Sequence, residues 1–280
     1  MASELEIDRT FVRITEGQVH IRTCGTPSAD TVPIYVVHPS PASARGMEPL
    51  IRLLSETRYV IAPDTLGNGD SAAPAEDEPD ITYFADSIVR ILDAMGIAKI
   101  DFYGSHTGGR SGCEMAGRHP DRVRRVVLDG IAEYDPDLKQ KILENYAPAV
   151  KPDQFGGHLL WAHQFVRDQA FYFPYFMRDP EHVLNNPGRS TEHLHAHTVD
   201  VLKGLTTYHK PYLAAFRYPA RERMPLIKVP TLVMAGESDP PHLQRGTEEM
   251  AALSDLAEMK LVGRAIEMKA AAALEFFNRA

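Results

Sequence analysis

Hydrophobic and polar positions along the chain alternate between two periods. The stretch FVRITEGQVHIRT (11–23) predicts a β-hairpin, because apolar side chains recur at every second position. Short apolar runs bounded by turn residues predict buried strands at 33–38, 59–64, 99–104, 122–130, 229–237 and 257–262. Spacings of three and four predict helices at 43–56, 80–96, 107–120, 242–255 and 265–280. Alternating strands and helices imply an α/β fold with a mostly parallel, doubly wound sheet.

This rhythm stops between residues 133 and 223. The segment is rich in His, Tyr, Phe and Pro, and its apolar spacing predicts helices at 158–169 and 191–205 but no strand. We therefore predict one core built from 1–132 and 224–280, with 133–223 as a helical insertion.

Composition narrows the classes of partner. A chain of 280 residues that is 44% hydrophobic can bury a large core. Its net charge of −8, without a Lys/Arg cluster, argues against nucleic acid and membranes as partners and favours a small-molecule substrate. The start, MASELEIDRT, has no signal-like pattern, and the two cysteines predict free thiols, so we expect a cytoplasmic protein. Whether it forms a homodimer stays open.

Four short motifs follow each other in a recognisable order. HPSP (38–41), APDTLGNGDS (62–71), GSHTG (104–108) and PTLVMAGESD (230–239) resemble the oxyanion turn, the PDxxGxGxS segment, the nucleophile elbow and the acid-bearing strand of the α/β-hydrolase superfamily. The resemblance points to the branch with a helical cap, which includes epoxide hydrolases, haloalkane dehalogenases and carbon–carbon bond hydrolases. It implies an α/β-hydrolase fold in which 133–223 is the cap.

The elbow motif carries an unusual apex. Gly104 and Gly108 are the small residues that a sharp strand-to-helix turn requires. The resemblance places the nucleophile at His106, in a subgroup with histidine at this position, and points Ser105 back toward the sheet.

The resemblance also places the catalytic acid at Asp239, with Asp129 or Glu133 as fallback acids. No histidine follows His242, so the usual C-terminal base is missing. We therefore expect a dyad in which Asp239 orients the imidazole of His106, which acts as base or nucleophile. His242 is the second candidate for the base.

Further residues can be assigned around the elbow. By position, the backbone N–H groups of Ser40 and Thr107 are the expected oxyanion donors. His38 is expected to be a structural hydrogen-bonding residue that lies near enough to be a spare base. Arg110 either meets a substrate carboxylate or caps the neighbouring loop.

The cap is expected to set the substrate. Its aromatic-rich stretch predicts an apolar pocket, in which we place His158, Trp161 and Tyr172. The HLHAH stretch (193–197) puts His193 and His197 on one helix face, but no carboxylate or cysteine completes a metal-ligand pattern, so we expect no metal.

Together these features predict a cofactor-free hydrolase of a small aromatic or cyclic carbonyl compound, with an ester, lactone or carbon–carbon bond as the target. Two alternatives remain: a base-catalysed lyase, decarboxylase or cyclase on the same fold, and a non-catalytic ligand-binding pseudoenzyme.

Overall fold

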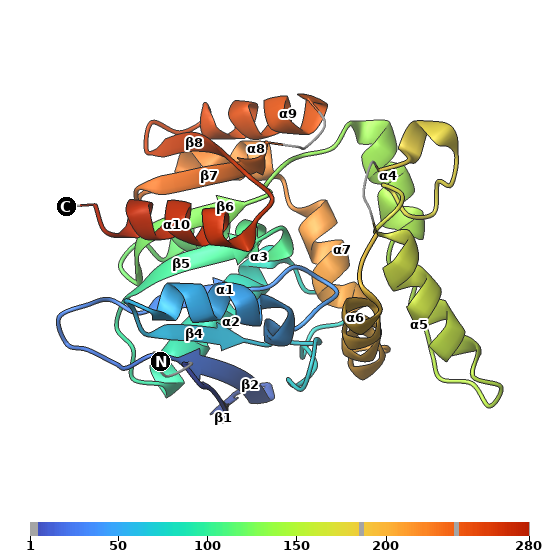
Figure 1. The fold of residues 1–280 in the computed structure, drawn as a ribbon, viewed down its shortest axis with the longest axis horizontal. Helices are drawn as coiled ribbons and strands as arrows, with labels where there is room; N and C mark the ends of the chain where they lie inside the picture. Colours follow the sequence, from blue (N-terminus) through green and yellow to red (C-terminus); the bar gives the residue numbers. More distant parts are fainter. Residues whose placement is uncertain (1–4, 185–187, 238–240, 280) are drawn as a thin grey trace.

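The computed structural model describes residues 5–184, 188–237 and 241–279 and contains an eight-stranded sheet with helices on both faces (Figure 1). The strands are β1 (Ile7–Ile14), β2 (Gly17–Cys24), β3 (Ile34–Val37), β4 (Val60–Pro63), β5 (Ile100–Ser105), β6 (Val123–Asp129), β7 (Thr231–Gly236) and β8 (Ala257–Val262). Their order is β1-β2-β4-β3-β5-β6-β7-β8, and all neighbours from β4 to β8 are parallel. The expected mostly parallel α/β sheet is confirmed.

Two apolar clusters hold helices against the two faces. One face is covered by α1 (Glu48–Ser55) and α10 (Ile266–Phe277). The other is covered by α2 (Ile81–Ala94), α3 (Thr107–Arg118), α8 (Ala220–Arg223) and α9 (Pro241–Ala251). Single 3-10 turns lie at Ala44–Met47, Pro180–His182 and Met224–Leu226. Among the described residues, no helix has the length and apolarity that a membrane crossing needs.

The predicted helix at 43–56 is two elements in the structure. A 3-10 turn, Ala44–Met47, is capped by the Ser43 side chain, and α1 starts after it with a proline in its first turn. Proline fits the start of an α-helix because it lacks the N–H that would bond to the preceding turn. The apolar spacing could not show this division, since both elements bury the same side.

Four helices lie beyond the edge of the sheet where the parallel strands end (Figure 1). They are α4 (Pro136–Asn145), α5 (Gly157–Asp168), α6 (Thr191–Lys203) and α7 (His209–Arg217), and we call them the cap helices. The sequence pattern predicted α5 and α6 but missed α4 and α7. A start signal for α4 was present, because the Asp135 side chain caps the helix and Pro136 is its first residue. The cap boundaries at 133–223 stay a proposal.

The cap helices share a third apolar cluster that is separate from the sheet. Its buried members include Tyr146, Phe165, Tyr175, Tyr208 and Phe216. Large rings fill the space between short helices with few residues, so a weak periodicity along each helix is enough for packing. This explains why helical spacing was a poor guide here.

Two glycines allow α3 to lie close to the strands beneath it. A Cβ atom on Gly104 would lie 2.1 Å from the Gly108 carbonyl oxygen, and one on Gly108 would lie 2.3 Å from the Val37 carbonyl oxygen. Both distances are far inside van der Waals contact, and the facing atoms are backbone. This turn therefore requires glycine at both positions, because backbone atoms occupy the place of a side chain.

We predict that Gly108→Ala lowers the free energy of unfolding by about 3 kcal/mol or more, because the added methyl must push two backbone segments apart. Urea unfolding followed by circular dichroism measures the loss. Gly246→Ala in α9 is the matched control, since nothing lies within 4 Å of its added Cβ, and it should be neutral or stabilising by up to ~1 kcal/mol. Equal losses in the two variants would contradict the close approach.

Candidate active site

His106 stands at the apex of the turn from β5 into α3. Its backbone has φ 48° and ψ −100°. In the described part of the chain, His106 is the only residue other than glycine with a positive φ. Such a conformation is costly for a residue with a Cβ atom, and costs of this kind concentrate at functional sites. The backbone N–H of His106 donates to the Asp129 carbonyl oxygen at 2.8 Å. The strained elbow therefore presents an exposed imidazole.

The imidazole of His106 lies against Gly130, the residue after β6. A Cβ atom on Gly130 would be 2.8 Å from both Nδ1 and Cε1 of the ring. Gly130 also has φ +83°, and its N–H donates to the Met234 carbonyl oxygen of β7 at 3.1 Å. Glycine at this position leaves room for the ring, which leans toward the β6 and β7 side of the elbow.

The expected acid lies outside the described residues. Asp239 follows β7 by three residues, and its geometry is not described; the same holds for the side chain of His242 in α9. The dyad of His106 and Asp239 therefore stays a prediction.

Both fallback acids have other partners. The Asp129 carboxylate accepts from the Tyr103 hydroxyl at 2.7 Å and from the Lys269 ammonium at 2.8 and 3.0 Å. Glu133 bonds the Lys139 ammonium at 3.3 Å and the Arg221 backbone N–H at 3.0 Å. These contacts support structural roles for both carboxylates.

The two predicted oxyanion donors lie next to each other, although they are 67 residues apart in the chain. The Ser40 N–H donates to the Thr107 hydroxyl at 3.3 Å, a long bond that a better acceptor could replace. The Ser40 hydroxyl is buried and has no hydrogen-bond partner among the described residues. Thr107 is the first residue of α3, where backbone N–H groups have no partner within the helix. Ser40 therefore lies beside Thr107, the residue that follows His106, and their role as oxyanion donors stays a prediction.

His38 is held on both sides of its ring. Nδ1 donates to the Pro39 carbonyl oxygen at 2.7 Å, and Nε2 accepts from the Thr65 N–H at 3.0 Å. The side chain is buried, and burial lowers its pKa below the usual value. These contacts favour the structural role and leave no ring nitrogen for the spare-base role.

The Arg110 side chain bonds to backbone carbonyl groups of the elbow and of the loop after β6. Its guanidinium donates to the His106 carbonyl oxygen at 3.2 Å and to the Ala132 carbonyl oxygen at 2.8 Å. Arg110 is 5% exposed, and Ser105, the last residue of β5, is 7% exposed. Of the two roles considered, the geometry supports the cap on the neighbouring loop.

The three residues assigned to the substrate pocket have different surroundings. His158 is the second residue of α5, and Nδ1 of its partly buried ring accepts from the Asp153 N–H at 3.1 Å. Trp161 stacks on Phe165 with ring centroids 4.9 Å apart, as part of the cap cluster. Tyr172 pairs with Val183 in an isolated antiparallel bridge. A shared substrate pocket for these three residues therefore stays a prediction.

A cationic group missed by the sequence analysis lies between α6 and the cap cluster. The Arg189 guanidinium contacts Nε2 of His193 at 3.1 Å and Nδ1 of His197. Burial lowers its pKa, and Tyr146 and Tyr212 are near enough to interact with its charge. Among the described residues, no carboxylate pairs with Arg189. In the sequence, the feature that pointed to this place was the pair of histidines on one helix face, and in the structure both histidines contact Arg189.

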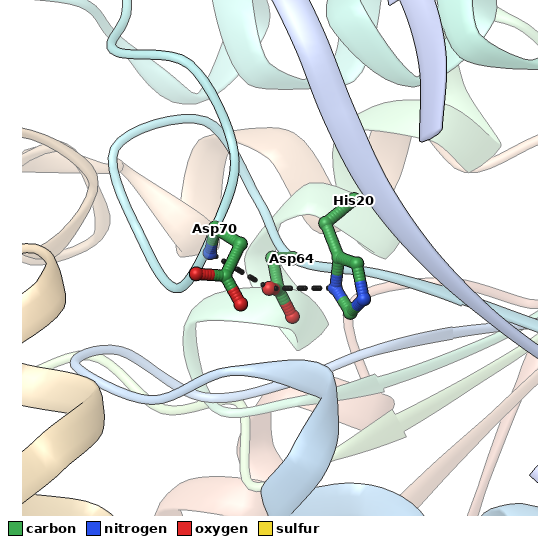
Figure 2. Close-up of side chains that lie close together, drawn as sticks. All are labelled: His20, Asp64 and Asp70. Carbon is green, nitrogen blue, oxygen red and sulfur yellow. Dashed lines mark hydrogen bonds and ion pairs between the residues drawn. The ribbon is translucent and has the colours of Figure 1, made fainter. Parts of the chain in front are cut away.

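His20, Asp64 and Asp70 form a cluster with metal-ligating side chains below the PDxxGxGxS loop (Figure 2). Asp64 accepts from Nδ1 of His20 at 2.9 Å and from the Asp70 N–H at 3.0 Å, and its other oxygen accepts from the Ala44 N–H at 2.8 Å. The Asp70 carboxylate pairs with Lys203 of α6 at 2.7 Å. Both Asp64 oxygens and one Asp70 oxygen accept from protein donors, and these contacts anchor the loop.

The buried Asp64 carboxylate also explains why residue 69 of the same motif is glycine. A Cβ atom on Gly69, which has φ +55°, would lie 2.2 Å from an Asp64 carboxylate oxygen. Ser71 closes the loop, because its hydroxyl donates to the Asp64 carbonyl oxygen at 2.7 Å. The motif therefore encodes a turn wrapped around one buried carboxylate.

We predict that Asp64→Asn lowers the free energy of unfolding at neutral pH by about 2 kcal/mol or more, since hydrogen bonds to a charged acceptor are the stronger ones. Burial raises the pKa of Asp64, but the bonds from His20 and the Asp70 N–H outweigh it and hold the pKa below the usual value. The stabilisation is therefore present above about pH 4 and is lost as pH falls through the lower folded pKa.

Urea unfolding of the wild type and Asp64→Asn at about pH 7 and pH 3 tests this prediction. The difference in free energy of unfolding between the two proteins should be smaller at about pH 3. Asp93→Asn serves as the control, since the Asp93 side chain is 63% exposed. A difference that stays constant with pH would contradict the role of the charge.

Relatives with similar sequences match parts of the chain. The 2-hydroxymuconate semialdehyde hydrolase of Pseudomonas sp. (strain CF600) is 36% identical over 115 residues, which are 40% of this chain and 41% of that protein. The putative carbamate hydrolase RutD of Caulobacter vibrioides (strain NA1000 / CB15N) is 29% identical over 132 residues, which are 46% and 49% of the two chains. The chain thus spans less than half the length of these curated relatives.

Similarity of structure extends over almost the whole chain. A solved structure of a mutant meta-cleavage product hydrolase from Pseudomonas fluorescens IP01 superposes with a TM-score of 0.70, covers 98% of both chains and is 19% identical. At this identity the likeness concerns the fold. The family model for the alpha/beta hydrolase fold matches residues 32–264, which include β3 to β8 and the cap helices. The chain therefore belongs to the α/β-hydrolase fold family.

Proposed function

We propose that the protein hydrolyses a small carbonyl compound at an ester, a lactone or a carbon–carbon bond next to a ketone. The relatives named above are hydrolases, one of a semialdehyde and one, by its printed name, of a carbamate. A semialdehyde and a carbamate both contain a carbonyl group, and an oxyanion site assists hydrolysis by addition to a carbonyl group.

The observation that carries the proposal is the arrangement around His106. An exposed imidazole lies at the strained apex, Ser40 adjoins Thr107, and the buried Ser40 hydroxyl has no hydrogen-bond partner among the described residues. A base next to a group of preformed donors is what addition to a carbonyl requires, because negative charge develops on the carbonyl oxygen. Gly130 gives the ring its room.

In the proposed mechanism, His106 takes a proton from water, and the resulting hydroxide adds to the substrate carbonyl carbon. The new oxyanion accepts from the backbone N–H groups of Ser40 and Thr107 and from the Ser40 hydroxyl. The oxyanion then reforms the carbonyl, the bond from the carbonyl carbon to the leaving group breaks, and protonated His106 gives its proton to the leaving group. We assign Asp239 to hold the imidazole in the required tautomer. The ring's lean toward the β6 and β7 side supports this, because β7 leads to Asp239.

Arg189 points to the substrate class. A partly buried guanidinium that has two imidazoles as partners, and no carboxylate among the described residues, is a receptor for an anionic group. Beside it, Tyr146 and Tyr212 lie edge to face with centroids 5.3 Å apart. We therefore propose an aromatic or cyclic substrate that carries a carboxylate.

A base-catalysed lyase is the second candidate, and the histidine apex favours it. A base at the elbow can remove a proton from carbon as well as from water, and the oxyanion donors would stabilise an enolate equally well. The two reactions differ in whether an oxygen atom from water enters the product. The proposal requires no cofactor in either case.

We predict that His106→Ala lowers kcat for phenyl acetate at least about 100-fold, as expected for loss of a general base. Initial rates with purified protein measure the change. His195→Ala is the control, because His195 is an exposed histidine on α6 and should keep wild-type rates. Product from a reaction in oxygen-labelled water should contain one labelled atom.

Unchanged turnover in His106→Ala would overturn the assignment of the base. Conversion without labelled oxygen would replace hydrolysis by the lyase reaction. No conversion of any carbonyl substrate, together with thermal stabilisation by one of them, would identify a binding protein.

We predict that Arg189→Gln raises KM for para-carboxyphenyl acetate about tenfold or more, because a hydrogen bond to a charged group contributes ~1.5–3 kcal/mol. KM for phenyl acetate, which has no carboxylate, should stay the same. Arg167→Gln is a matched control in the same cap, where Arg167 pairs with Asp168 at 2.7 Å. Equal rises in KM for both esters would show a general loss of cap structure instead.

A further inference from the structure

The cap helix α6 touches the oxyanion turn and the loop beside it through a row of polar contacts. His197 Nε2 bonds the Pro41 carbonyl oxygen, the Ser43 hydroxyl donates to the Asp200 carboxylate at 2.9 Å, and Lys203 pairs with Asp70 at 2.7 Å. The α6 residues are three positions apart, so they lie on one helix face. One face of α6 therefore binds the segment that holds Ser40.

The His197 contacts determine which ring nitrogen carries the proton. A carbonyl oxygen only accepts, so Nε2 must donate to Pro41, and a guanidinium only donates, so Nδ1 must accept from Arg189. The ring is therefore neutral in this arrangement. Burial, followed by the charge of Arg189, lowers the pKa of His197 to about 4, in agreement with that state.

A continuous chain of hydrogen bonds thus runs from Arg189 through His197 to Pro41, next to the oxyanion donor Ser40. Every hydrogen bond that the described residues make to the Arg189 guanidinium uses the Nη1 nitrogen. Its other edge, formed by Nε and Nη2, is the edge that binds a carboxylate through two parallel bonds. A carboxylate there would fix the guanidinium without displacing His197.

We propose that His197 is a positioning residue, which transmits occupation of Arg189 by a carboxylate to the backbone N–H of Ser40. A held guanidinium keeps Nη1 on Nδ1 of His197, and the ring then keeps Nε2 on the Pro41 carbonyl oxygen. The oxyanion turn is ordered in this way when an anionic substrate is present. The inference rests on the proposed function, because it assigns a second task to the same site.

This role separates binding from turnover. Arg189 contacts the carboxylate, whereas the hydrogen bonds of His197 to described residues go to Arg189 and to the oxyanion turn. Loss of His197 should therefore reduce kcat and leave the KM preference for the carboxylate in place. Loss of helix docking in general would change both.

The kinetic test compares His197→Leu with His197→Gln on para-carboxyphenyl acetate and phenyl acetate. Gln can donate to Pro41 and accept from Arg189, so its kcat should stay within about twofold of wild type. Leu fills similar space without either bond, and its kcat for the charged ester should fall about tenfold, the scale of a small misplacement of catalytic groups. Its ratio of KM values should remain that of wild type. His195→Gln is the control on the exposed side of α6.

A second readout does not require turnover. In protein labelled with nitrogen-15 at serine, NMR detects the Ser40 backbone amide. Its signal is assigned as the one that is missing in Ser40→Ala. Benzoate should shift this signal in a saturable way in wild type and His197→Gln. In His197→Leu it should bind with affinity within about twofold of wild type and leave the Ser40 signal in place.

Three results would overturn the coupling: a Ser40 shift that persists in His197→Leu, an equal loss of kcat in the Leu and Gln variants, or no saturable Ser40 shift in wild type. Failure of the proposed hydrolysis looks different, since wild type would then cleave neither ester while the benzoate titration still reports on His197.

Discussion

The close approach of helix α3 to the strands beneath it is the constraint on which the site depends. Gly108 leaves no room for a Cβ atom over the Val37 carbonyl oxygen, so the start of α3 sits directly on the end of β3. The chain after β3 then emerges beside the first residue of α3, which brings Ser40 to the Thr107 hydroxyl. His106, between β5 and α3 at this contact, has a positive φ. The proposed base and the proposed oxyanion donors are thus all placed around one backbone contact.

Polar anchoring holds the loops on the other side of the site. Asp64 is buried and accepts hydrogen bonds from His20 and from the backbone N–H groups of Ala44 and Asp70, which anchor the loop around it (Figure 2). Asp70, on the same loop, pairs with Lys203 of α6. That pair is exposed, whereas Asp200 of α6 is buried and accepts from the Ser43 hydroxyl at 2.9 Å. A buried carboxylate requires hydrogen-bond partners, so the Asp200 contact ties the cap to the core more specifically than apolar packing would. The cap helix is therefore positioned by the same loops that it covers.

The core of the fold could be predicted because its signals are local. Each strand and crossover helix has its own apolar period, and Gly104, Gly108 and Gly69 mark turns that another residue could not form. The cap was harder, since α4 and α7 are short and are stabilised by rings from other helices. Of the site, the elbow apex and the pair of Ser40 and Thr107 were predictable by position. Arg189 was not, because nothing near it in sequence indicates what it faces.

The sequence by itself determined the sheet, the order of the motifs and the residue at the apex, because these depend on period, turn chemistry and position in the chain. The tertiary structure decided which polar groups act on each other. It showed that Arg110 and His38 bond to backbone, that Asp129 pairs with Lys269, and that His197 joins Arg189 to Pro41. Such pairs lie tens to more than a hundred residues apart in several cases. A hydrogen bond forms only when two atoms lie within about 3 Å, so a bond between segments far apart in sequence depends on how the elements pack. A local sequence pattern cannot predict that packing.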